Sequence, residues 1–145
     1  MRKKNKIRTV FNAQDRVYHN KGNAPLINLL GLLGNNVNLI LDVGCGAGNN
    51  AYLIKSKYKK CEIFGITNSH AEANIAKKYM KQCFLFDIES DFPSDLNKKL
   101  FDVLIFSHVL EHLKDPAGAL EKFSRLLRKD GFILIAVPNI LSWRM

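Results

Sequence analysis

Apolar and polar positions follow two alternating periods along this chain. Continuous apolar runs, typical of strands buried on both faces of a sheet, lie at 37–43, 62–66, 83–86, 101–106 and 132–137. Segments with helical spacing separate these runs and lie at about 23–33, 49–56, 69–81 and 115–130. Residues 88–99 hold Pro93 and scattered charges, which predicts a loop.

Two of the predicted helices carry start signals. Asn23 is a capping residue with Pro25 in the first turn, and Asp115 caps a helix that Pro116 opens. Asp130-Gly131 follows the last apolar position of that second helix, and we expect it to end the helix there.

Five strands that alternate with helices predict the α/β class, with a parallel sheet wound by right-handed crossovers. Ligands of such sheets bind at the carboxyl ends of the strands, beside the first strand, where the winding direction reverses. We therefore expect the functional residues to follow the strands directly.

The composition is that of one globular domain. The 145 residues are 47% hydrophobic and 24% charged, and no apolar stretch reaches the roughly 18 to 20 residues that span a bilayer. The start, MRKKNKIRTV, lacks the apolar core of a signal peptide, which predicts a cytosolic protein without a membrane partner. Cys45, Cys61 and Cys83 form no C-x-x-C pair, so we expect free thiols and no metal site.

The net charge of +9 is most concentrated at the N-terminus, where five of the first eight residues are basic. This predicts a basic, disordered tail at 1–10 followed by one domain at 11–145. Binding of nucleic acid by the tail stays open as an alternative. It is disfavoured because the other lysines lie on helix-like faces without the interleaved aromatic residues of a base-stacking surface.

A glycine-rich turn follows the first apolar run, in the order LDVGCGAGNN. Gly44, Gly46 and Gly48 remove three Cβ atoms where a helix begins, so the backbone can approach a bound molecule closely. The spacing predicts a nucleotide-type pocket. A dinucleotide fingerprint would need glycine at Asn49, which disfavours a hydride-transferring Rossmann domain.

The segment LDVGCGAG resembles the first motif of the class I S-adenosylmethionine (SAM) dependent methyltransferases. FDVLIFSHVLEHLKDP and LLRKDGFILIAVPN are similar to the fourth and fifth motifs of small-molecule methyltransferases, including those that methylate quinones and sugars, so the resemblance covers residues 11–141. It implies a Rossmann-like, mostly parallel sheet of order 3-2-1-4-5 with SAM as cofactor.

That family adds a helix and an antiparallel hairpin after strand five, and we expect this domain to lack strands six and seven. Two explanations stay open: the chain is part of a longer protein, or a partner covers the edge that strand five leaves. Self-association through that edge is one such expectation.

The resemblance also implies cofactor contacts. The glycine turn, with Asp42, Gly44, Cys45, Gly46 and Gly48, corresponds to the part that holds the methionine and ribose moieties of SAM. Asp87 corresponds to the acid that accepts from the adenine amino group, and Ile88 to the residue that packs on the ring. Ser107 and His108 follow the fourth strand and face the expected methyl donor.

One position departs from the usual family pattern. Thr67 stands where an acid usually accepts both ribose hydroxyls. The segment GITNS resembles the cyclopropane-fatty-acid synthase branch, in which threonine stands there and a polar residue five positions later assists. Ribose recognition is therefore expected from Thr67, Asn68 or Glu72, with weakened cofactor binding as the alternative.

His108 to His112 also spells H-x-x-E-H, a zinc-peptidase pattern. It is disfavoured because such enzymes use a long metal-binding helix, whereas here a proline-capped helix begins four residues later. We expect His112 to be a structural residue of the connector.

The resulting hypothesis is a SAM-dependent methyltransferase acting on a small molecule, with oxygen as the expected acceptor atom. His108 is then the first candidate for the base, and Tyr18 and His19 are candidates to close over the cofactor. Two alternatives stay open: a non-catalytic SAM-binding or interaction module, and a nucleic-acid methyltransferase. Only the basic tail favours the last, because no Asn-Pro-Pro-Tyr-like motif follows the fourth strand.

Overall fold

A five-stranded parallel sheet of order β3-β2-β1-β4-β5 forms the centre of the computed structural model, which describes residues 21–139. This is the order expected from the sequence. The strands are β1 Leu39–Val43, β2 Glu62–Thr67, β3 Gln82–Leu85, β4 Phe101–Ser107 and β5 Leu127–Ala136.

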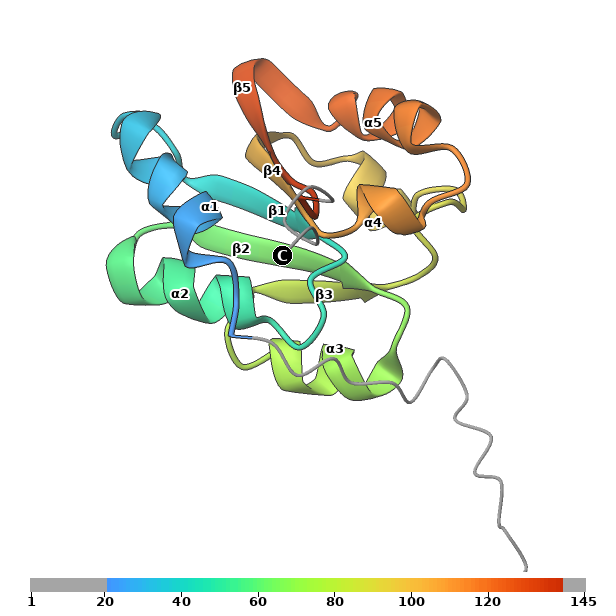
Figure 1. Ribbon diagram of the computed structural model, residues 1–145, viewed down its shortest axis with the longest axis horizontal. Coiled ribbons are helices and arrows are strands. Elements are labelled where there is room, and N and C mark those ends of the chain that lie inside the picture. The colour runs from blue at the N-terminus through green and yellow to red at the C-terminus, as the bar shows by residue number, and fades with distance from the viewer. Residues whose placement is uncertain (1–20, 140–145) are drawn as a thin grey trace, which may run out of the picture.

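Helices cover both faces of the sheet (Figure 1). The helices on one face are α1 Ala24–Asn28, extended by the 3₁₀ turn η2 Leu29–Leu32, then α2 Asn49–Lys57 and α3 His70–Ala76. The elements on the other face are α4 Ser94–Asn97, the 3₁₀ turn η3 Leu110–His112, and α5 Pro116–Ser124.

Neighbouring residues of the central strands point into two separate cores. Ile40 and Ile105 pack under α1 and α2, whereas Leu41 and Leu104 pack under α5, and all four side chains are fully buried. Burial on both faces explains why these strands are almost continuously apolar. Asp42 is the exception to this apolar pattern, because its side chain is ionisable and yet fully buried within β1.

Both predicted helix caps are confirmed. The Asn23 side chain accepts a hydrogen bond from the Leu26 N–H at 3.1 Å, and the Asp115 side chain accepts one from the Gly118 N–H at 2.9 Å. Each cap satisfies a backbone donor that the first helical turn leaves unpaired.

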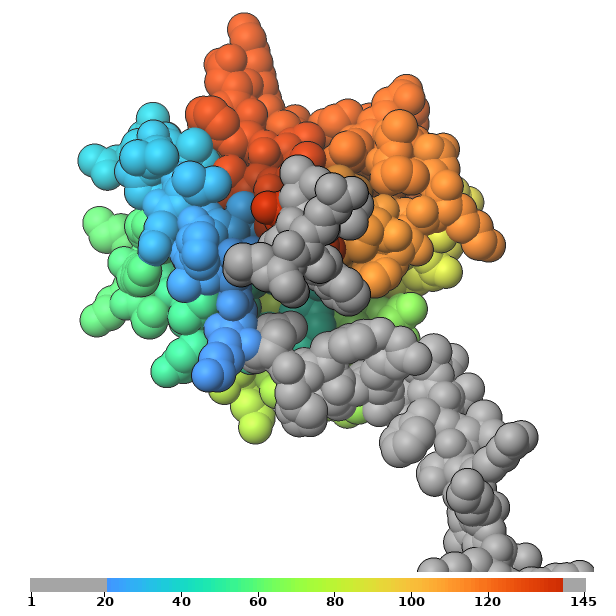
Figure 2. Space-filling view, viewed as in Figure 1, coloured from blue at the N-terminus to red at the C-terminus, as the bar shows by residue number. Residues whose placement is uncertain are grey.

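The predicted end of the last helix at Asp130-Gly131 is wrong, because α5 ends at Ser124. The carbonyl of Leu126 accepts a hydrogen bond from the Phe101 N–H at 2.7 Å, so the chain joins the sheet there. Asp130, at φ +63°, instead lies in an irregular part of β5, which shifts the register between Phe101 and Val103. The first half of β5 projects from the body of the molecule (Figure 2).

Two other segments differ from the expected elements. The helix predicted to reach Lys81 ends at Ala76, because the Lys81 N–H must donate to the Ile63 carbonyl at 2.8 Å as the chain enters β3. The predicted loop at 88–99 contains the one-turn helix α4, whose Leu96 is fully buried and anchors the segment to the core.

Phe132 and Ile135 on the outer strand β5, and Val137 directly after it, stay about half exposed, so this edge carries the apolar surface expected from the sequence. Self-association through it stays a prediction. Among residues 21–139, no helix is long and apolar enough to cross a membrane. The predicted tail at 1–10, Tyr18, His19 and the last six residues lie outside the described part of the chain.

Candidate functional site

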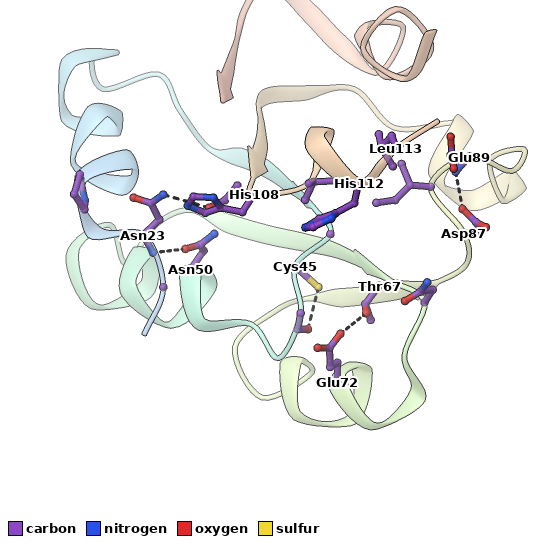
Figure 3. A pocket seen from close by; sticks show the side chains of 18 residues that line it. Asn23, Cys45, Asn50, Thr67, Glu72, Asp87, Glu89, His108, His112 and Leu113 are labelled. Atoms are coloured by element: carbon purple, nitrogen blue, oxygen red, sulfur yellow. Dashed lines mark hydrogen bonds between the residues drawn. The ribbon is translucent and has the colours of Figure 1, made fainter. Parts of the chain in front are cut away.

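A cavity of about 860 Å³ opens at the carboxyl ends of the strands. Ten of the twelve cofactor-binding residues expected from the sequence line it: Gly44, Cys45, Gly46, Thr67, Asn68, Glu72, Asp87, Ile88, Ser107 and His108. In Figure 3, His108 and His112 lie on one side of the cavity and Thr67 and Glu72 on the other, with Cys45 between them.

The glycine turn forms the floor of this cavity. Gly44 has φ +73°, and a Cβ there would lie 2.6 Å from Cγ2 of Val109, so no side chain fits. Gly46 has φ +53°, and a Cβ there would contact only the Glu72 carboxylate, 3.7 Å from Oε1. The turn is fixed by the Cys45 N–H, which donates to the Ile66 carbonyl at 2.8 Å.

Asp42 and Gly48, the other two expected residues, do not line the cavity. Gly48 is the N-cap of α2 at φ +85°, where a Cβ would lie 3.0 Å from the Cα of Ala76, so its role is close packing of α2 on α3. Asp42 lies beneath the turn. Asp42 is covered because it precedes the last residue of β1, a central strand that is packed on both faces.

Asp42 is a desolvated acid. Its side chain is fully buried, and within the described part of the chain neither carboxyl oxygen has a hydrogen-bond partner. Burial raises the pKa of Asp42 to about 7, and the nearby amide of Asn50 acts in the opposite direction. An orphaned buried carboxyl behind a glycine turn is typical of a site that receives a donor or a cation.

At the position that departs from the family pattern, Thr67 is hydrogen-bonded to Glu72. The Thr67 hydroxyl donates to Oε2 of Glu72 at 2.8 Å, and the Thr67 oxygen accepts from the Ser69 N–H at 3.2 Å. Both side chains are buried and face the cavity. A buried carboxylate from α3 therefore lies at the end of the second strand, where it accepts the hydrogen bond of Thr67.

The segment after β3 is held from two other elements. Lys122 of α5 donates to the carbonyls of Ile88 at 2.6 Å and Ser90 at 2.7 Å, and Oε1 of Glu89 accepts from the Lys114 N–H at 2.8 Å. Burial lowers the pKa of Lys122. These bonds fix Asp87 and Ile88 on the cavity wall although they lie in a loop.

His108 has an uncommon backbone conformation at the end of β4. Its φ is +55°, and its N–H donates to the Ala136 carbonyl at 2.9 Å, which fixes the residue to β5. Nδ1 of His108 lies 3.7 Å from Oε1 of Glu111, which also lies 3.9 Å from Nε2 of His112. A left-handed conformation at a non-glycine residue is strained and occurs preferentially at functional sites.

His112 lies in the 3₁₀ turn η3, and its expected structural role in this connector stays a prediction. It lines the cavity, and 76% of its side chain is exposed. Among the described residues, no group of three or more histidines, cysteines and acids is placed to hold a metal ion.

A family model described as "Methyltransferase domain" matches residues 16–145. The chain belongs to this methyltransferase family. The cavity described above is thus the candidate active site of a methyltransferase domain.

Two relatives show the range of the family. The (S)-tetrahydroprotoberberine N-methyltransferase of Eschscholzia californica is 30% identical over 100 residues, 66% of this chain and 28% of that protein. The ubiquinone biosynthesis O-methyltransferase of Pelagibacter ubique is 32% identical over 104 residues, 69% of this chain and 42% of that protein. The chain thus matches less than half the length of each of these relatives.

Solved structures share the fold. The plantazolicin methyltransferase BpumL in complex with S-adenosylhomocysteine (SAH) has a TM-score of 0.63 and 25% identity, covering 76% of this chain and 42% of that one. Coclaurine N-methyltransferase bound to N-methylheliamine and SAH has a TM-score of 0.62 at 24% identity, covering 76% of this chain and 34% of that one.

Sequence reasoning missed the N-terminal wall of the active site. Asn23 was expected only as a cap, yet its N–H donates to Oδ1 of Asn50 at 2.8 Å and its Nδ2 donates to Oγ of Ser107 at 3.4 Å (Figure 3). No local signal identifies these contacts, because they join residues 27 and 84 positions apart. The other lining residues not expected as cofactor contacts are Gly22, Pro25, Glu89, Val109, His112 and Leu113.

Proposed function

We propose that this methyltransferase domain binds SAM in the cavity and transfers its methyl group to a nitrogen or oxygen atom of a small-molecule acceptor. One observation carries the proposal: residues that follow four different strands, and that match the family's cofactor motifs, surround a single cavity. The carboxylates of Glu72 and Asp87 line this cavity and the carboxyl of Asp42 lies buried outside its lining, which suits a cofactor that carries hydroxyl, amino and ammonium groups.

The residues present fit SAM group by group. Glu72, held by Thr67, offers a carboxylate for the two ribose hydroxyls, and Asp87 offers one for the adenine amino group. The cradle at Gly46 leaves room for the methionine part, above the orphaned carboxyl of Asp42. When bound, SAM supplies a methyl group that the sulfonium activates toward an acceptor lone pair.

The domain itself contributes alignment and a proton acceptor. Near-attack geometry needs the acceptor atom about 3 to 3.5 Å from the methyl carbon. His108 follows the strand that faces the donor, and we assign it the role of general base, which takes the proton of an acceptor hydroxyl or ammonium. The Glu111 carboxylate, 3.7 Å from Nδ1, then stabilises the imidazolium that forms.

The cofactor assignment is tested by titration calorimetry with SAM and SAH. We expect Glu72→Gln to weaken SAM binding by about 10- to 100-fold, because hydrogen bonds to a charged acceptor are lost in a buried site. Glu62→Gln is the matched control, since Glu62 lies on the surface and pairs with Lys81. Equal SAM affinity of the Glu72 and Glu62 variants would contradict the ribose assignment, and binding without turnover would favour a non-catalytic module.

The role of His108 is tested with His108→Asn. Asparagine tolerates a positive φ, so the variant removes the imidazole while keeping the backbone conformation. We expect kcat to fall by about 100- to 10,000-fold with little change in SAM affinity. SAH release is measured with a panel of secondary amines and catechols, and His70→Asn, on the exposed start of α3, is the control. An unchanged kcat would rule out His108 as the base.

A further inference from the structure

Two of the three cysteines are in contact beside the cavity, which Cys45 lines and Cys83 does not. Sγ of Cys45, in the glycine turn, lies 3.7 Å from Sγ of Cys83 in β3, although 38 positions separate them in the sequence. The third cysteine is elsewhere, since the Cys61 thiol donates to the Val37 carbonyl at 3.3 Å. All three are free thiols.

Gly65 makes this contact possible. It pairs with Cys83 across β2 and β3, and a Cβ on Gly65 would lie only 2.7 Å from Sγ of Cys45 and 2.4 Å from Sδ of Met80. Because Gly65 has no side chain, the thiol of Cys45 reaches over β2 to Cys83. A side chain at this position would separate the two sulfur atoms.

The two thiols differ in environment. Cys45 is 7% exposed, whereas Cys83 is only partly buried and so is open to small reagents. The hydrogen bond between the two thiols lowers the pKa of the Cys83 thiol, burial acts in the opposite direction, and the nearby Lys77 also lowers it. The same hydrogen bond, together with burial, raises the pKa of Cys45. Cys83 is therefore the more reactive thiolate, and Cys45 is a partner that keeps its proton.

We propose that Cys45 and Cys83 are an oxidisable dithiol that closes to a disulfide when a peroxide reaches Cys83. The Cys83 thiolate attacks one peroxide oxygen, the O–O bond breaks, and Cys83 becomes a sulfenic acid as hydroxide leaves. The Cys45 sulfur then attacks the sulfenic sulfur, the S–S bond forms, and water leaves with the proton of Cys45. In sum, two thiols lose two hydrogens and hydrogen peroxide becomes two waters.

Closure would alter the floor of the cavity. The two sulfur atoms must approach from 3.7 Å to the bond length of about 2.05 Å, which moves Cys45 toward β3. Gly44 and Gly46 are its neighbours in the turn and both line the cavity, so they move with it. The expected consequence, which rests on the proposed function, is SAM binding weakened by about tenfold or more, because a preorganised turn is lost.

Peroxide titration with mass spectrometry tests the dithiol. The reduced chain is treated with one equivalent of hydrogen peroxide, free thiols are blocked with iodoacetamide, and peptides are mapped without reductant. We expect a Cys45–Cys83 cross-link that dithiothreitol reverses, with Cys61 alkylated. Cys61→Ser should cross-link equally and Cys83→Ser should not. Absence of the cross-link in the wild-type chain, or pairing through Cys61, would overturn the proposal.

SAM titration of the oxidised and reduced chains tests the consequence separately. Weaker binding by the oxidised chain, restored by dithiothreitol and absent in peroxide-treated Cys83→Ser, supports a redox-sensitive site. A cross-linked chain with unchanged affinity would overturn the effect on the cavity. If the reduced chain does not bind SAM, the proposed function fails, while the peptide map still decides whether the dithiol exists.

Discussion

Gly46→Val is expected to weaken SAM binding by about 100-fold or more, as measured by titration calorimetry. The Cβ of this residue would point into the cavity toward Glu72, 3.7 Å from Oε1, so the valine methyl groups occupy space that the cofactor needs. A side chain at φ +53° also costs about 1 to 2 kcal/mol of backbone strain.

Gly34→Val separates these two effects. Gly34 also has a positive φ, +84°, but a Cβ there meets nothing within 4 Å, and it does not line the cavity. We expect a similar loss of stability in thermal unfolding, with SAM affinity unchanged. If both variants bind SAM as the wild-type chain does, the glycine turn is not the cofactor site.

Asp42→Asn is expected to stabilise the unliganded domain above pH 7. The folded-state pKa of about 7 exceeds the ordinary aspartate pKa of 3.8, so the folded protein holds a proton that the unfolded chain releases. Stability is therefore lost as the pH rises from about 4 to 7, by up to about 4 kcal/mol in total. Asparagine keeps the shape of the side chain without the buried charge.

Urea unfolding at pH 5 and pH 8 measures this effect. The free energy of unfolding of Asp42→Asn should exceed that of the wild-type chain by more at pH 8 than at pH 5. At pH 8 the variant should also bind SAM more weakly than the wild-type chain. Asp130→Asn is the control, since Asp130 is exposed and asparagine suits its φ of +63°. If the two proteins differ in free energy of unfolding by the same amount at both pH values, Asp42 is not protonated in the folded domain as expected.

Local signals were sufficient for most of the fold. The apolar runs, the caps at Asn23 and Asp115 and the glycine turn each act through neighbours in the sequence, and the structure confirms them. The end of α5 was mispredicted because Leu126 and Leu127 satisfy both helical spacing and strand pairing. Pairing with Phe101, a long-range contact, decided between the two.

The features of the candidate site can also be divided into those that the sequence predicts and those that only tertiary packing decides. In a parallel sheet the strand ends meet at one edge, so the sequence alone brought Gly46, Thr67, Asp87 and His108 to one place. Three contacts were decided only by the tertiary structure. They are the hydrogen bond from Thr67 to Glu72, the hydrogen bond from Asn23 to Ser107 in the cavity wall, and the contact of Cys45 with Cys83. Those contacts depend on how helices and loops pack over the strand ends. The hydrophobic pattern of a sequence reports local structure, so it does not give the distance between side chains that lie far apart in the chain.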